Sequence, residues 1–121
     1  MSHTVLVVDD EPDVRTFLIA VLKKRGYQTL SAADGREAFE VLQRERPDLV
    51  ILDLQMPNQT GTDFFRRLTK DKELGQTPVI VVSGLAGRHL AFKQPVAVFD
   101  KPIDPDEFGE VVDKTLGADE G

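Results

Sequence analysis

The stretch "TVLVVDDEPDV" (residues 4–14) contains the transition that decides the fold. A β-branched apolar run gives way to three consecutive carboxylates, Asp9, Asp10 and Glu11, and Pro12 follows them. Proline is favoured in the first turn of a helix, so the stretch predicts a strand that leads into a helix. Like charges repel, and a carboxylate at the edge of a core is costly to desolvate. The adjacent acids therefore need a reason other than packing.

Similar short runs recur along the chain. Most of them are continuously apolar rather than alternating, which is typical of strands that are covered on both faces. The run "YQTLS" is the weakest of the set. Together the runs predict five strands, at residues 4–8, 27–31, 48–52, 78–82 and 96–99.

Helical patterns separate the predicted strands. An apolar stripe with helical spacing follows Pro12, and Gly26 suits the position just past the end of that helix. The stripe consists of Val14, Phe17, Leu18, Val21 and Leu22. Asp34 is a suitable N-cap for the next helix. Three more helices are predicted, at about 35–45, 62–70 and 105–116.

Strands that alternate with helices predict a parallel sheet between two helix layers, which is a doubly wound α/β fold. A chain of 121 residues has the size of one domain. We expect residues 1–121 to form a single domain, with a frayed tail at about 117–121.

Composition excludes several classes of function. The chain has no cysteine, which excludes disulfides, thiolate metal sites and cysteine nucleophiles. Its net charge of −6 argues against direct binding of nucleic acid, which requires basic patches. The chain begins without a basic segment, and every apolar run is too short to span a membrane. We expect a cytoplasmic protein that contacts no membrane.

Polar residues follow four of the five predicted strands: Asp9 and Asp10, then Asp53, Ser83 and Lys101. Each alone has an ordinary explanation as a helix cap, a turn residue or a solvated charge. In open α/β sheets, however, ligands bind at the carboxyl ends of the strands. In the strand order 2-1-3-4-5, strands one, three, four and five are neighbours, so these five side chains would share one cleft.

The charges of this cluster predict a metal ion. Two carboxylates about 4 Å apart repel by roughly 4 kcal/mol at an effective dielectric constant of 20, and one lysine cannot neutralise three of them. A divalent cation can, and oxygen ligands without His or Cys favour Mg²⁺. A lysine and a hydroxyl beside the metal are suitable partners for phosphate oxygens. The residues thus indicate a Mg²⁺-assisted phosphate site in which a carboxylate could act as the nucleophile.

Four segments, in this order, resemble the receiver domains of bacterial two-component response regulators. They are the acidic pair in "VLVVDDEP", the D-x-x-M-P-x-x-x-G pattern in "VILDLQMPNQTG", the hydroxyl in "VIVVSG" and the lysine in "DKP". The resemblance covers nearly the whole chain. It implies a flavodoxin-like (βα)5 fold with the sheet order 2-1-3-4-5.

The resemblance also implies roles for individual residues. Asp53 would accept a phosphoryl group from the phosphohistidine of a sensor histidine kinase or a histidine phosphotransfer protein. Asp10, Asp53 and the backbone carbonyl of Gln55 would hold Mg²⁺, with Asp9 assisting, in this reading through water. The chain would not be an enzyme beyond its self-catalysed phosphotransfer and autodephosphorylation.

The other two polar residues bind the phosphoryl group in this family. Lys101 would pair with one phosphoryl oxygen, and Ser83 would bind another when the domain switches. The Lys101–Pro102 bond resembles a cis peptide of the family. Phosphorylation could also produce a homodimer.

Three features depart from the family pattern. The aromatic residue three positions before the lysine is replaced by Val98, and Phe99 would face the opposite side of the strand. The residue after the hydroxyl is Gly84 rather than alanine. The separation from Ser83 to Lys101 is about four residues shorter than the family's, which removes about one helical turn.

The segment 84–95 is also rich in helix-breaking residues, with Gly87 and Pro95 besides its first glycine. An interior glycine costs a helix about 1 kcal/mol. We therefore expect a short or irregular fourth helix. Of the adjacent Phe64 and Phe65, we expect one in the core and one partly exposed.

Two other functions are compatible with the residues. A Mg²⁺-dependent phosphohydrolase with an aspartyl nucleophile would use similar chemistry, but such enzymes carry a D-x-D pair after the first strand and usually a cap domain. A degenerate receiver acting only as a protein-binding module would explain Val98 and the altered fourth helix. Turnover of phosphate esters would support the former, and phosphorylation without a conformational response would support the latter.

Overall fold

The computed structural model describes residues 3–53, 56, 60–82, 96–99 and 102–117. These form a five-stranded parallel sheet with the order β2-β1-β3-β4-β5, as predicted. The strands are β1 (Thr4–Val8), β2 (Gln28–Ala32), β3 (Leu49–Leu52), β4 (Val79–Val82) and β5 (Ala97–Phe99). The helices are α1 (Pro12–Lys24), α2 (Gly35–Glu45), α3 (Thr60–Lys70) and α4 (Pro105–Leu116), with a short 3₁₀ helix, η2 (Leu74–Gln76). The segment 84–95, where we expect a short or irregular fourth helix, lies outside the described residues.

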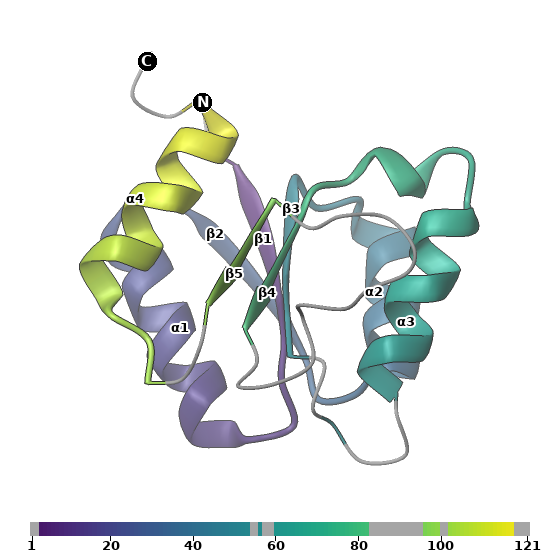
Figure 1. The fold of residues 1–121 in the computed structure, drawn as a ribbon, viewed down its shortest axis with the longest axis horizontal. Coiled ribbons are helices and arrows are strands. Elements are labelled where there is room, and N and C mark those ends of the chain that lie inside the picture. Colours follow the sequence, from purple (N-terminus) through teal and green to yellow (C-terminus); the bar gives the residue numbers. More distant parts are fainter. Residues whose placement is uncertain (1–2, 54–55, 57–59, 83–95, 100–101, 118–121) are drawn as a thin grey trace.

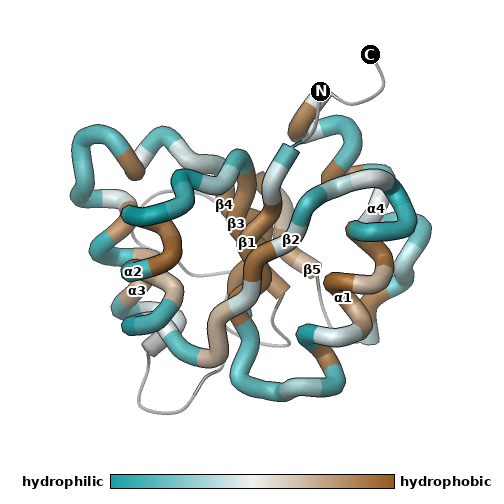
Figure 2. The backbone as a smooth tube through the Cα atoms, turned by 180° about the vertical axis from the view of Figure 1, so that it is seen from behind, coloured by the Kyte–Doolittle hydropathy of each residue, from teal (hydrophilic) through white to brown (hydrophobic). Residues whose placement is uncertain are grey.

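Two helix layers enclose the sheet. Figure 1 shows α1 and α4 on one face and α2 and α3 on the other. In Figure 2 the central strands are hydrophobic, whereas the outer surfaces of the helices and the connecting loops are largely hydrophilic. Among the described residues, no helix has both the length and the apolar character that a membrane span requires.

Strand β1 shows why the strand sequences are continuously apolar. Leu6 and Val8 pack into the core beneath α2 and α3, and Val5 and Val7 pack into the core beneath α1 and α4. All four side chains are fully buried. A strand covered on both faces has no solvent-facing side, so it needs no polar alternation.

Helix α1 begins at Pro12, and Gly26 has φ of +93° just beyond its end, as predicted. Tyr27 donates its backbone N–H to the carbonyl of Leu22, which completes the helix end and delays the start of β2 to Gln28. Of the predicted apolar stripe, Leu18 and Leu22 are buried, whereas the Phe17 side chain is 39% exposed. Phe17 lies at the margin of the stripe, where it lines an open groove of about 480 Å³ between α1 and the start of α4.

The start of α2 is fixed by a reciprocal cap. The Asp34 carboxylate accepts the Glu37 N–H at 2.8 Å, and the Glu37 carboxylate accepts the Ala33 N–H at 2.7 Å. The first bond satisfies an N–H of the first turn that has no acceptor within the helix, and the second holds the residue that precedes the N-cap. The predicted N-cap is therefore confirmed.

Helix α3 differs from prediction in two ways. It begins at Thr60, with Gly61 in its first turn, rather than at residue 62. Phe64 and Phe65 are both buried, so the prediction that one is partly exposed is wrong. Phe64 packs edge-on against Phe39 of α2 at 6.3 Å between ring centroids, because α3 packs against α2 as well as against the sheet.

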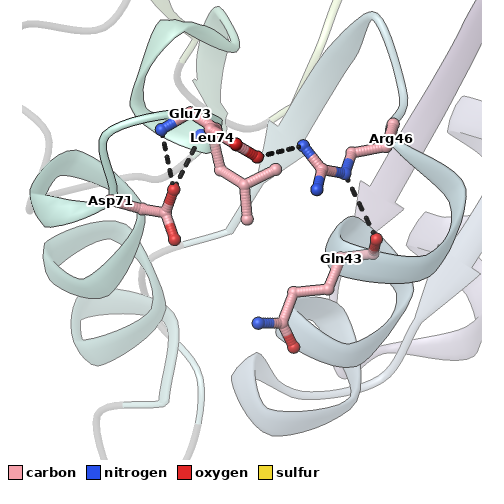
Figure 3. Close-up of polar contacts among 5 residues, drawn as sticks. All are labelled: Gln43, Arg46, Asp71, Glu73 and Leu74. Atoms are coloured by element: carbon pink, nitrogen blue, oxygen red, sulfur yellow. Dashed lines mark hydrogen bonds and ion pairs between the residues drawn. The ribbon is translucent and has the colours of Figure 1, made fainter.

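The loops at the amino end of the sheet are joined by charged side chains (Figure 3). Arg46, which follows α2 in a left-handed conformation with φ of +50°, donates to the carbonyl of Gln43 at 3.3 Å and pairs with Glu73 at 3.1 Å. Asp71 accepts the backbone N–H groups of Glu73 and Leu74 at 2.9 and 2.8 Å. These bonds hold η2 so that Leu74 fills the core beneath α2 and α3.

Asp113 attaches helix α4 to the segment that connects α1 with β2. This carboxylate accepts hydrogen bonds from the Arg25 guanidinium and, at 2.5 Å, from the Tyr27 hydroxyl. Arg25 crosses α4 directly over Gly109, where a Cβ atom would overlap the arginine side chain. A helical glycine costs about 1 kcal/mol relative to alanine, and here it provides the space for this ion pair.

Candidate functional site

The acidic residues predicted to converge do so at the carboxyl end of the sheet, the lower edge in Figure 1. Asp9 follows β1 and donates its N–H to the carbonyl of Ala32 at 3.2 Å, and Asp53 follows β3 and donates its N–H to the carbonyl of Val8 at 2.9 Å. The ladder of hydrogen bonds thus continues one residue beyond the strands. It fixes the backbone from which both carboxylates project.

Three carboxylates form one cluster. Asp9 and Asp53 are 0% and 1% exposed, and Asp10 is half-buried. One oxygen from each residue lies within 4.8 Å of the other two. At that separation, two unit charges repel by about 3–4 kcal/mol at an effective dielectric constant of 20.

The donor set fits a hard divalent cation. Carboxylate oxygens are the ligands that Mg²⁺ prefers, and Mg²⁺ commonly uses only one or two of them while keeping water molecules. A bound cation would also reduce the repulsion among the three carboxylates. Asp9, Asp10 and Asp53 could therefore hold Mg²⁺ between them.

Hydrogen bonds with the start of α1 hold Asp9 in place. Its side chain accepts the Glu11 N–H at 2.9 Å, and its backbone carbonyl accepts a hydrogen bond from Arg15 Nη1 at 2.6 Å. Glu11 is the exposed N-cap of α1.

Arg15 is not among the residues predicted from the sequence to lie at the site. It is the fourth residue of α1, near the positive end of the helix macrodipole, where a cation is disfavoured. A basic residue six positions after an acidic strand end is the signal that could have identified it. Its side chain reaches back over the turn between β1 and α1.

Three predicted site residues, Gln55, Ser83 and Lys101, lie outside the described residues, as do Gly84 and the Lys101–Pro102 peptide bond. The strands that lead to two of them are described. Strands β4 and β5 are paired, with Val82 opposite Phe99 at their ends.

The predicted orientations in β5 are confirmed. Val98 is 39% exposed and is paired with Val81, which packs beneath α2 and α3. Phe99 packs on the opposite face against Phe108 of α4, with ring centroids 5.7 Å apart. Phe99, the residue after Val98, therefore packs into the core beneath α1 and α4.

Comparison with known proteins identifies the family. Residues 5–113 match the response regulator receiver domain. The chain is 34% identical over 116 residues to Protein Rrf1 of Nitratidesulfovibrio vulgaris, covering 96% of this chain and 84% of that protein. It is 35% identical over 118 residues to sporulation initiation phosphotransferase F of Bacillus subtilis, covering 96% and 95%. A response regulator receiver protein from Pseudomonas putida has a similar structure, with a TM-score of 0.83, 34% identity, and coverage of 94% and 98%.

The chain belongs to the response regulator receiver domain family and is a phosphoacceptor domain of bacterial phosphorelay signalling. Its fold is flavodoxin-like, as predicted. Receiver domains are in general non-enzymatic signalling modules that bind Mg²⁺ at an acidic pocket and interact with histidine kinases or phosphotransfer proteins.

Proposed function

We propose that Asp53 accepts the phosphoryl group, with Mg²⁺ held by Asp10, Asp53 and the carbonyl of Gln55, and with Asp9 acting through water. The observation that carries this proposal is the cluster of Asp9, Asp10 and Asp53 at the carboxyl end of the sheet. Asp53 is the first residue of the D-x-x-M-P-x-x-x-G pattern, and it directly follows the central strand β3.

The transfer is an in-line displacement at phosphorus. A carboxylate oxygen of Asp53 attacks the phosphorus of a phosphohistidine, the P–N bond breaks, and the imidazole leaves and takes up a proton. The product is an acyl phosphate on Asp53. Bound Mg²⁺ supplies charge neutralisation for the phosphoryl oxygens.

The protein contributes position and charge to this step. The hydrogen bond between the Asp53 N–H and the Val8 carbonyl anchors the nucleophile to the neighbouring strand. From the sequence pattern, Lys101 is assigned to one phosphoryl oxygen and Ser83 to another in the switched state. This division of roles is electrostatic positioning rather than covalent catalysis by further groups.

The wider role follows from the same chemistry. The phosphodonor is a sensor histidine kinase or a histidine phosphotransfer protein, and transfer and loss of the phosphoryl group are self-catalysed. Residues 1–121 act as one receiver domain in the cytoplasm, without direct contact with nucleic acid. Phosphorylation promotes a homodimer in this proposal, which size-exclusion chromatography with Mg²⁺ and beryllofluoride would detect.

A direct test is incubation with acetyl phosphate and Mg²⁺, followed by intact-mass measurement. The native chain should gain one phosphoryl group, and Asp53→Asn should gain none. Asp63→Asn, which removes an exposed carboxylate in the first turn of α3, is the matched control and should be phosphorylated like the native chain. Absence of a mass gain in the native chain would overturn the proposal, and turnover of many equivalents would instead indicate a phosphohydrolase.

A further inference from the structure

Arg15 places a permanent positive charge beside the acidic cluster. Its Nη1 donates to the Asp9 carbonyl at 2.6 Å, a short charge-assisted hydrogen bond in a partly buried setting. Asp9 carries one of the three clustered carboxylates. The guanidinium is therefore attached to the same residue whose side chain belongs to the cluster.

The charge and the hydrogen bond have different consequences. Before a cation binds, the guanidinium offsets part of the repulsion among the three carboxylates. After a cation binds, the same charge opposes it. The hydrogen bond, in contrast, holds the backbone of Asp9 in both states, together with the bonds between the Asp9 N–H and Ala32 and between the Glu11 N–H and the Asp9 side chain.

The position of Arg15 in its helix supports a role for the charge. A cation near the start of a helix opposes the macrodipole, whereas Lys23 and Lys24 occupy the favourable last turn of the same helix. Among the described residues, no carboxylate forms an ion pair with Arg15. Within the described part of the chain, its side chain donates one hydrogen bond, to the main chain at the cluster.

We propose that Arg15 is a positioning residue that stabilises the metal-free acidic site and sets its affinity for Mg²⁺. This inference rests on the proposed metal site. The positive charge of Arg15 lowers the repulsion among the carboxylates in the metal-free site. The same charge lowers the affinity of the site for Mg²⁺. Metal occupancy would then respond to changes in cellular Mg²⁺ concentration rather than remain saturated.

Three substitutions separate charge from hydrogen bonding. Arg15→Lys keeps the charge, Arg15→Gln keeps an N–H donor without the charge, and Arg15→Met keeps the apolar stem and loses both. Arg44→Met is the matched control, because Arg44 is an exposed arginine in the last turn of α2, at the other end of the sheet.

Mg²⁺ affinity is measured by titration of backbone amide chemical shifts, and metal-free stability is measured by thermal unfolding in EDTA. Arg15→Gln and Arg15→Met should bind Mg²⁺ about three- to tenfold more tightly, the size that Coulomb's law gives for one charge close to a divalent cation in a hydrated site. Arg15→Lys and Arg44→Met should stay within about twofold of the native chain. The gain for Arg15→Met should shrink as the KCl concentration rises.

Each outcome has a distinct meaning. Weaker Mg²⁺ binding by Arg15→Met and Arg15→Gln, or binding equal to that of the native chain, would overturn the inference and leave the metal site standing. If the native chain binds no Mg²⁺, or binds it as well after Asp10→Asn, the proposed metal site fails and this inference fails with it. If Arg15→Met and the native chain have the same melting temperature in EDTA, Arg15 does not stabilise the metal-free site.

Discussion

Acidic side chains at the two ends of the sheet have different neighbours. At the amino end, Asp48 accepts the backbone N–H of Thr4 at 2.8 Å, Asp71 accepts two N–H groups of the following turn, and Glu73 pairs with Arg46. Each of these three acids has a hydrogen-bond donor. These side chains fasten helices and strands to one another.

At the carboxyl end, Asp9, Asp10 and Asp53 face one another. Asp9 and Asp53 are almost fully buried. At the amino end, in contrast, Asp48 and the ion pair of Glu73 with Arg46 are exposed. The acids at the amino end meet donors, whereas the three clustered acids at the carboxyl end also meet one another, even though Asp9 accepts the Glu11 N–H. Substitutions at the two ends should therefore change stability with opposite signs.

The largest effect is expected from the apolar residue that the amino-end loop inserts into the core. Leu74→Ala should lower the free energy of unfolding by about 2–4 kcal/mol, because it leaves a cavity beneath α2 and α3. Urea unfolding followed by circular dichroism measures this, with Leu74→Met as the volume-matched control. Phosphorylation of the folded protein should not change. A loss below about 1 kcal/mol would show that η2 is not part of the core.

A pair of isosteric substitutions tests the difference in sign directly. Asp10→Asn should raise the metal-free free energy of unfolding by about 1 kcal/mol, because it removes one charge from the cluster. Asp48→Asn should lower it by about 0.5–1.5 kcal/mol, because the acceptor for the Thr4 N–H loses its charge. Thermal unfolding in EDTA measures both. A loss of stability in both variants would show that repulsion at the carboxyl end is already compensated.

Asp10→Asn and Asp48→Asn also test how the stability of the protein responds to Mg²⁺. Addition of Mg²⁺ should raise the melting temperature of the native chain and of Asp48→Asn, because ligand binding to the folded state stabilises it. It should leave Asp10→Asn nearly unchanged. An equal response in all three proteins would place the cation elsewhere.

The smallest effect concerns Arg46. Its left-handed backbone disfavours any residue with a Cβ by roughly 1 kcal/mol, whereas its exposed ion pair contributes about 0–1 kcal/mol. Arg46→Gly should thus be near neutral, and Arg46→Ala should be less stable than Arg46→Gly by about 1 kcal/mol in urea unfolding. Equal stability of the two variants would show that the backbone there is unstrained.

The regular part of the fold was predictable because its signals are local. The apolar runs of β1, β3 and β4 are buried on both faces, and caps such as Asp34 and Gly26 act within a few residues of their position. The convergence of Asp9, Asp10 and Asp53 was also predictable, because parallel strands in this order bring their carboxyl ends together. None of these inferences requires knowledge of how the helices are inclined.

The features that could not be predicted concern contacts between elements distant in sequence. The exposure of Phe17 depends on how far α4 extends over α1, and the burial of both Phe64 and Phe65 depends on the approach of α2. Arg46 and Arg15 act through long side chains that reach other turns. Helical periodicity gives the direction of a side chain but does not give the distance to a neighbouring helix.

The hydrogen bond between Asp53 and Val8 has a consequence for how the chain can tolerate insertions and deletions. Val8 is paired with Leu52, and the two acids are the next residue on each strand. A residue deleted within β1 would leave every motif readable in the sequence, but it would turn Asp9 to the other face of the sheet. The proposed metal site therefore depends on strand register as well as on residue identity. A protein that retains every acid could still lose the acidic cluster through a shift of one position.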